Sequence, residues 1–419
     1  MHRRFLIPVL LASVLAAGCG GKYQLPTEHP AARPVASDKS YAMLQTWKGM
    51  DYIQNILLTQ GKYSQLFLLF NTTYPASYPN VLTGPDVPRG YVRLYPFANP
   101  VPVDESYFPR PKTLFNPVAL CSATGRLFVL DQGDTCMAKY DAVRATCEAD
   151  PTPVTPTTLP RPSIIWDYRS TWRVREYAYN DPGQKYTGDT TSTFTDTTFV
   201  QVFGVAADGQ GRVYVAGVAA LLDTSKIDNH VRTREFTYRI FRYQRGAKYA
   251  GLVPDELNWD RNMPGAGGRW YRDTTWYVGT GTGTGFVTDP RGIAWSPAGL
   301  PSLLVADRGN KQAKTISPNA VSTGYVVFDG SEPHSPAPFT SPEAVAADLQ
   351  GFLYVVDRNP ITPRVVRYDP YGQFVQVVNL EPNSDSQQLL NPVTVGVDDS
   401  VAYVGDRGRG QVIRYKRRP

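Results

Sequence analysis

The chain has 419 residues, of which 42% are hydrophobic and 19% are charged, so a sizeable core is available and wholesale disorder is excluded. This length fits two or three ordinary domains or one large all-β domain. The net charge of +6 is mild, and no nucleic-acid partner is predicted, because that reading requires a clustered basic face on a recognisable module. The 36 Pro, 35 Gly and 26 Tyr favour many short strands joined by turns over a helical bundle.

The first 18 residues have the pattern of an export signal. Arg3 and Arg4 precede an apolar run, residues 5–17, that is too short to stay in a bilayer as a resident helix. The run ends in Leu-Ala-Ala-Gly-Cys, which resembles the lipobox of bacterial lipoproteins. The resemblance implies cleavage before Cys19 and acylation of that cysteine by diacylglycerol and palmitate. An ordinary secretory signal with an incidental cysteine is the alternative.

Lipidation at Cys19 would make the membrane the first partner of this chain. Three acyl chains hold a protein durably, whereas a single chain binds only marginally. Gly20 and Gly21 follow the cysteine in place of the Asp that retains such lipoproteins at the inner membrane. The resemblance therefore implies the outer membrane, with the folded part facing the periplasm or the exterior. Residues 19–40 contain three prolines and no apolar periodicity, which predicts an extended tether.

The segment 41–62 is ambiguous between helix and strand. Met43, Trp47 and Met50 recur at helical spacing, but Gly49 interrupts them, and residues 52–58 are equally consistent with a buried strand. We predict a strand at 52–58. The repeats that follow end at Tyr415, too close to the C-terminus to include an outer strand for the last unit, and this segment is expected to supply it.

The rest of the chain contains an internal repeat. A Pro-led apolar stretch is followed by a second stretch that ends in Asp at Asp307, Asp357 and Asp406, spaced 50 and 49 residues apart. A looser copy ends at Asp131, another has Gly217 in place of the Asp, and a weak sixth unit lies around residue 71. A third strand closing in an aromatic follows each copy. The four aspartates are expected to cap their turns by accepting backbone N–H bonds.

This pattern resembles the NHL repeat, which implies an all-β fold, a six-bladed β-propeller with four antiparallel strands in each blade. Such small sheets bury their faces only against their neighbours, so the blades must close into a ring. The predicted organisation is a signal peptide at 1–18, a tether at 19–40 and a propeller at 41–419. Within the propeller, residues 41–62 form the closing segment and residues 63–419 form the blades.

Two of the intervals between units are long. Asp131 and Gly217 lie 86 residues apart, and Gly217 and Asp307 lie 90 apart, which leaves long loops rich in Thr, Pro and Gly on one rim, where binding commonly occurs. Three cysteines remain in a chain exported to an oxidising compartment. We predict a disulfide between Cys136 and Cys147 and a buried thiol at Cys121.

The sequence lacks the usual catalytic signatures. It has no phosphate loop, no Gly-x-Ser-x-Gly elbow and no His-Glu-x-x-His pair. Only His29, His230 and His334 follow the predicted signal peptide, and His29 lies in the tether, so no three-His zinc site is expected. No cofactor and no metal are predicted. The alternative is a metal-dependent lactonase or hydrolase of propeller fold, for which Glu343, Asp348 and Asp398 are candidate carboxylates. Structural or solvated roles are the preferred interpretation of these three residues.

A basic residue follows the Asp in three successive units, at Arg308, Arg358 and Arg407. Equivalent positions fall on one rim of a propeller, so we predict an arc of arginines, extended by Lys311 and Arg409. Arg291 would join it only if the start of its strand reaches that rim. The predicted function is a lipid-anchored, non-enzymatic module that binds or scaffolds an envelope protein or an acidic glycan. Pairing of each Arg with a carboxylate of the next blade is the structural alternative.

Overall fold

In a computed structural model, residues 41–59, 65–71, 91–96, 106–108, 117–123, 126–131, 173–178, 190–194, 199–222, 234–245, 270–298, 301–319, 326–379 and 389–418 are described. The predicted signal peptide, the tether with Cys19, and the predicted disulfide cysteines Cys136 and Cys147 lie outside them. Every regular element in the described ranges is a β-strand. None of the described residues forms a helix long and apolar enough to cross a membrane.

The described strands form six sheets, numbered here in chain order. Sheet 1 contains β2 (Ile53–Leu58), β3 (Gln65–Phe70), β4 (Tyr91–Pro96) and β5 (Ser106–Phe108), and sheet 2 contains β6 (Pro117–Ala123), β7 (Arg126–Asp131), β8 (Arg173–Ala178) and β9 (Thr190–Phe194). Sheet 3 contains β10 (Phe199–Ala207), β11 (Val213–Leu222), β12 (Arg234–Arg245), β13 (Trp270–Thr280) and β14 (Phe286–Val287). Sheet 4 contains β15 (Pro290–Ser296), β16 (Ser302–Asp307), β17 (Gln312–Ile316) and β18 (Val327–Phe328), and sheet 5 contains β19 (Pro342–Ala347), β20 (Leu353–Asp357), β21 (Arg364–Tyr368) and β22 (Phe374–Val377). Sheet 6 contains β23 (Pro392–Val397), β24 (Val401–Asp406), β25 (Gln411–Arg417) and, at its edge, β1 (Tyr41–Lys48).

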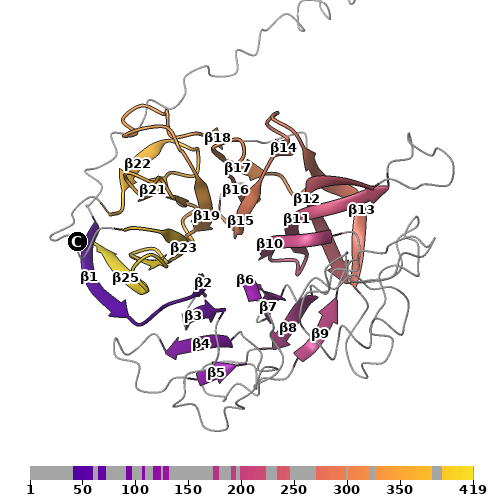
Figure 1. The fold of residues 1–419 in the computed structure, drawn as a ribbon, viewed down its shortest axis with the longest axis horizontal. Helices are drawn as coiled ribbons and strands as arrows, with labels where there is room; N and C mark the ends of the chain where they lie inside the picture. The colour runs from indigo at the N-terminus through magenta and orange to yellow at the C-terminus, as the bar shows by residue number, and fades with distance from the viewer. Residues whose placement is uncertain are drawn as a thin grey trace, which may run out of the picture. The chain divides into compact units, whose positions relative to one another are not determined.

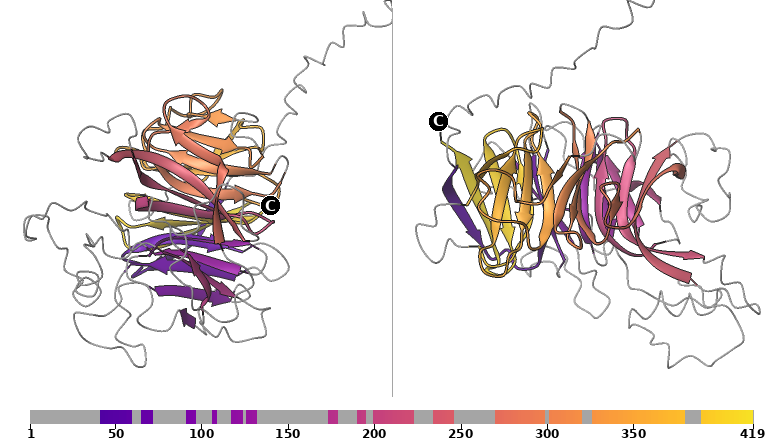
Figure 2. Two further views of the ribbon diagram at one scale, coloured as in Figure 1. Left: turned by 90° about the vertical axis from the view of Figure 1, so that its right-hand side faces the viewer. Right: turned by 90° about the horizontal axis from the view of Figure 1, so that it is seen from above.

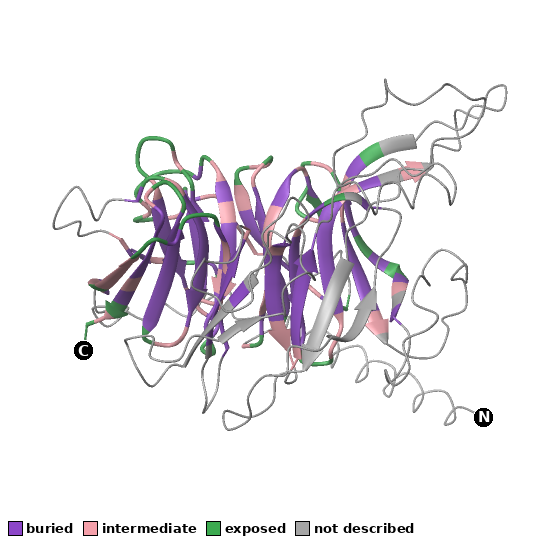
Figure 3. Ribbon diagram, turned by 60° about the horizontal axis from the view of Figure 1, so that its bottom comes forward, coloured by how far each residue is buried: buried purple, intermediate pink, exposed green. Residues whose placement is uncertain are grey.

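The sheets surround a common centre, and the first strand of each lies nearest to it (Figure 1). Figure 2 shows the same sheets from two further sides. The all-β class and the propeller arrangement predicted from the repeat are confirmed. Buried residues occupy the strands, and exposed residues gather in the connections at the strand ends (Figure 3).

The strand that pairs with β25 differs from the one that the sequence predicted. Residues 52–58 do form a strand, β2, but it is the inner strand of sheet 1, so this sheet begins at Ile53 and not at residue 63. The strand that pairs with β25 is β1, antiparallel from Tyr41 opposite Arg417 to Lys48 opposite Gln411. The physical reason is burial: β1 is mostly half-buried, as befits an outer strand, whereas Ile53 is fully buried.

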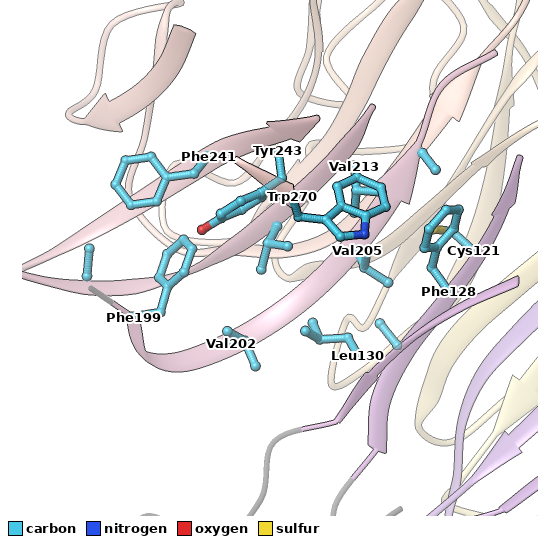
Figure 4. Close-up of a cluster of buried hydrophobic side chains, with 14 residues drawn as sticks. Cys121, Phe128, Leu130, Phe199, Val202, Val205, Val213, Phe241, Tyr243 and Trp270 are labelled. Atoms are coloured by element: carbon cyan, nitrogen blue, oxygen red, sulfur yellow. The ribbon is translucent and has the colours of Figure 1, made fainter. Parts of the chain in front are cut away.

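Cys121 lies in the apolar layer between sheets 2 and 3. Its neighbours in this cluster include Phe128, Val205 and Trp270, and the Phe128 and Trp270 rings meet edge to face with centroids 6.0 Å apart (Figure 4). The thiol is buried and forms no disulfide, as predicted, and burial raises its pKa far above the usual value. A neutral thiol of this kind acts as a small hydrophobic side chain.

Inner strands of neighbouring sheets approach closely enough to require glycine. A Cβ atom on Gly292 of β15 would lie 2.7 Å from the Ala344 Cα atom and 2.9 Å from the Glu343 carbonyl oxygen of β19. The start of β15 therefore lies beside the start of β19, and the side chains that follow are brought to one end of the ring centre.

Candidate functional site

The aspartates that end the second strands hold the start of the first strand of the same sheet. The Asp307 carboxylate accepts the N–H groups of Thr288 and Asp289, at 3.0 and 3.1 Å. Asp357 accepts those of Thr340 and Ser341 at 3.1 and 2.8 Å. In each sheet the Asp lies in register with the proline that opens the first strand. These carboxylates therefore join two strands, rather than only capping their own turn.

Asp406 both holds the start of the first strand of its sheet and caps its own turn. It accepts the N–H groups of Leu390 and Asn391 ahead of β23 and that of Gly408 within its own turn, at 2.8 to 3.0 Å. The proline opening the strand lacks an N–H group, so the donors must come from the two residues before it. Asp131 is also buried and lies in register with Pro117, which extends the Pro–Asp pairing to sheet 2.

A central cavity of about 660 Å³ is lined by the inner strands of all six sheets. Four residues of its wall lie at one end: Gln54, Arg291, Glu343 and Arg407. We call these four side chains, together with Asp289, Arg308 and Arg358 beside them, the arginine mouth. It contains four guanidinium groups and two carboxylates, so its formal charge is positive.

Contacts between sheets hold the arginine mouth together. Arg308 binds Asp289 of its own sheet at 2.6 Å, and its nearest approach to Glu343 of the next sheet is 3.7 Å. Arg291 also pairs with Asp289, at 2.8 Å, and its guanidinium lies over the Phe203 ring, 4.3 Å from the centroid. Arg291 therefore does reach the rim. Arg308 was expected either to bind a ligand or to pair with a carboxylate, and the structure shows it paired with carboxylates.

Arg407 and Arg358 behave differently from Arg308. The Arg407 guanidinium donates to the Ile53 carbonyl oxygen at 3.1 Å and to the Gln54 Oε1 atom at 2.6 Å. Burial first, and then the charge of Arg358, lower the pKa of Arg407, while Glu343 raises it. Arg358 is exposed, and within the described ranges its guanidinium forms no hydrogen bond or ion pair. Among the described residues, Arg308 is thus the one of the three predicted arc arginines that pairs with a carboxylate, whereas Arg407 pairs with neutral oxygens and the Arg358 guanidinium pairs with nothing.

The two residues predicted to extend the arc do not join the cavity wall. Lys311 is exposed, has a positive φ of 55° in the turn after β16, and lies outside the wall of the cavity. Arg409 is partly exposed in the turn after β24 and is likewise outside the wall.

A Gly-rich segment that sequence reasoning assigned to a binding rim has a packing role. Cβ atoms on Gly279, Gly281 and Gly283 would approach atoms of Phe286 to 3.4, 3.1 and 3.1 Å. The alternating glycines therefore leave space for this ring. The Lys314 ammonium donates to the Phe286 carbonyl oxygen at 2.5 Å and fixes the end of the segment to sheet 4.

Two of the candidate carboxylates for metal chemistry lie in turns after first strands. Asp348 accepts the N–H groups of Gln350 and Phe352 at 3.1 and 2.8 Å, and Asp398 does the same for its own turn. Within the described residues no group of three or more His, Cys, Asp or Glu could hold a metal ion. The preferred structural interpretation of Asp348 and Asp398 agrees with these contacts.

Sequence reasoning missed an Asp–Tyr pair that recurs on the side of the sheets away from the mouth. Asp348 accepts a hydrogen bond from the Tyr354 hydroxyl at 3.2 Å, and Asp208 accepts one from Tyr214 at 3.0 Å. The Tyr354 hydroxyl also lies 2.8 Å from that of Tyr41, on the closing strand. The signal was present as Asp-x-x-Gly-x-x-Tyr, once at 208–214 and again at 348–354.

Burial of Asp348 predicts a pH-dependent stability. Burial raises the pKa of its carboxyl from 3.8 to about 6, so between these values the folded protein holds a proton that the unfolded chain has lost. Stability therefore falls as pH rises through this window, by on the order of 2 kcal/mol. Asp348→Asn keeps an oxygen acceptor for the turn and should remove this fall. Urea unfolding of both proteins from pH 4 to 7 measures it, and parallel profiles would contradict the assignment.

No protein-family model matches the chain, and no curated protein matches it. Among solved structures, the chain is similar to a catalytically inactive virginiamycin B lyase from Staphylococcus aureus with quinupristin, with a TM-score of 0.44 and 7% identity over 90% of this chain and 99% of that one. It is also similar to Raptor from Chaetomium thermophilum, with a TM-score of 0.44 and 11% identity over 91% of this chain and 29% of that one. A third similar structure is a luciferin-regenerating enzyme, with a TM-score of 0.44 and 11% identity over 89% of this chain and 95% of that one. Similarity at this level carries no activity over to this chain, and the NHL resemblance stays a prediction.

Proposed function

We propose that this chain is a lipid-anchored module of the cell envelope, a closed six-bladed propeller of NHL type that binds an anionic partner without catalysing a reaction. The arginine mouth carries the proposal. It gathers Arg291, Arg308, Arg358 and Arg407 at one end of a cavity of about 660 Å³, against only two carboxylates. The export signal and Cys19 support an anchor at the outer membrane.

The partner is an acidic glycan or an acidic segment of an envelope protein. Guanidinium groups hold carboxylates and phosphates through paired hydrogen bonds, and four of them concentrate positive potential at one opening. The Arg308–Asp289 pair is partly exposed on the Arg308 side, and Asp289 keeps Arg291 as a second partner, so loss of Arg308 should cost little stability.

Replacing Arg308, Arg358 and Arg407 together with Gln should weaken polyanion binding at least about tenfold, or about 1.4 kcal/mol. The melting temperature should change little, because the lost pairs are partly exposed. Biolayer interferometry with immobilised polygalacturonate and poly-glutamate measures the affinity, and calorimetry measures the melting temperature. If the triple variant melts much earlier and keeps its affinity, the arc is scaffolding and the proposal fails.

A further inference from the structure

The wall of the arginine mouth mixes hydrogen-bond donors with acceptors. Besides Arg291 and Arg407, the cavity is lined there by the amides Gln54, Asn55 and Gln201 and by the carboxylate of Glu343. A site for a simple polyanion would present donors alone, because a central carboxylate repels it. The ligand that fits this wall must therefore carry an anionic group and hydroxyl donors together.

Glu343 is the residue that needs a donor. Its Oε2 atom is covered and accepts no hydrogen bond within the described residues, and the closest cation, Arg308, remains 3.7 Å away. The side chain is 18% exposed and belongs to the cavity wall. A carboxylate held in this state gains most from a ligand hydroxyl, since charge-assisted hydrogen bonds are about twice as strong as neutral ones.

Arg358 and Arg407 provide the complementary half. The carbonyl oxygen of Ile53 and the side chain of Gln54 orient Arg407. The Arg358 N–H group donates to the Ser341 carbonyl oxygen at 2.8 Å, which places Arg358 beside the start of the strand that carries Glu343, and its guanidinium forms no hydrogen bond or ion pair within the described residues. The guanidinium groups of Arg358 and Arg407 could therefore bind one carboxylate of a ligand between them. The planar guanidinium suits a carboxylate better than a lysine ammonium would.

The size of the cavity restricts the ligand further. A volume of about 660 Å³ is within the range of small-molecule sites, and an opening on the axis of a ring admits the end of a chain rather than a broad protein surface. The guanidinium of Arg291 lies over the Phe203 ring and also pairs with Asp289, and these two contacts hold a planar donor at the wall.

We propose that the arginine mouth binds the end of an acidic polysaccharide, with a uronate carboxylate between Arg358 and Arg407 and sugar hydroxyls on Glu343 and the adjacent amides. This inference rests on the proposed function and names its ligand. An acidic peptide is the competing ligand, but its side chains bring only acceptors to Glu343.

Calorimetric titration of the mature chain with three probes tests the inference. The probes are trigalacturonate, a neutral galactose trisaccharide with hydroxyls but no carboxylate, and tri-glutamate with carboxylates but no hydroxyls. We expect trigalacturonate to bind at least about tenfold more tightly than either control. Arg358→Gln should weaken trigalacturonate binding about tenfold. Because the Arg358 side chain is exposed, this variant should fold normally. Lys416→Gln, an exposed cation at the far end of β25, should change nothing.

Glu343→Gln separates the two ligand classes. It should weaken trigalacturonate and strengthen tri-glutamate, because the amide is a poorer acceptor and no longer repels carboxylates. If it strengthens both, or if tri-glutamate binds as tightly as trigalacturonate in the native chain, the mouth is a peptide site. In that outcome the proposed function stands and this inference falls. If none of the probes and no longer polyanion binds, both fall.

Discussion

Replacing Lys314 with Met is expected to lower the free energy of unfolding by about 3 kcal/mol. The Lys314 ammonium lies 2.8 Å from the Asp307 carboxylate, and both side chains are completely buried. Met has nearly the same length but no charge, so the variant leaves a buried carboxylate without its cation. The loss is large because removing one partner of a buried pair strands the other in a low-dielectric interior.

The effect should extend to the start of β15. Asp307 also accepts the N–H groups of Thr288 and Asp289, so its displacement would release the strand that carries Arg291. Unfolding in guanidinium chloride measures the loss in the free energy of unfolding. Lys311→Met is the matched control, because Lys311 is exposed in the turn just before β17, three residues ahead of Lys314, and it should change stability by less than about 0.5 kcal/mol. Equal small losses in both variants would show that the buried pair contributes nothing.

Removing β1 should destabilise sheet 6. A chain that begins at Gly49 lacks the strand paired with β25 from Arg417 to Gln411, and it loses the Trp47 ring, whose centroid lies 5.6 Å from that of Tyr403. It also loses the Tyr41 hydroxyl, which joins the Asp348–Tyr354 pair of sheet 5. We expect the melting temperature to fall by on the order of 10 °C and the chain to aggregate through the exposed edge of β25.

A chain beginning at Lys39 is the control for this deletion, since it keeps β1 entire. Tyr41→Phe separates the strand from the hydroxyl network and should cost only about 1 kcal/mol, the net value of one hydrogen bond. Calorimetry and size-exclusion chromatography measure the three chains together. If the chain from Gly49 melts with that from Lys39, β1 does not stabilise sheet 6.

The sequence pattern alone predicted those features in which a residue type plays the same structural role in each repeat. Pro290 and Asp307 could be aligned with Pro342 and Asp357 from the sequence, and each pair lies in register in its sheet. Burial of Cys121 followed equally from its apolar strand. The strand at 52–58 was also predicted, but not its place in sheet 1, because an apolar run specifies burial and not which neighbour it pairs with.

The candidate site required the tertiary structure. Arg308 and Arg358 occupy the same repeat position, yet one binds Asp289 and the other has no described partner, because the residues facing them come from other strands. Arg291 lies at the mouth, paired with Asp289 and over the Phe203 ring, and the sequence had left its place open. Side-chain partners across neighbouring sheets depend on how the sheets pack, and no spacing along the chain reports this.

The amino-acid sequence by itself determined the all-β class, the repeat and the position of its turns, because alternating apolar strands, prolines and aspartates act within a few residues of one another. Only the tertiary structure decided that β1 pairs with β25, that Tyr41 meets Tyr354, and that Arg291 and Arg407 both line one cavity. These contacts join residues hundreds of positions apart. They form because each small sheet must bury its faces against the next, and that packing chooses the partners.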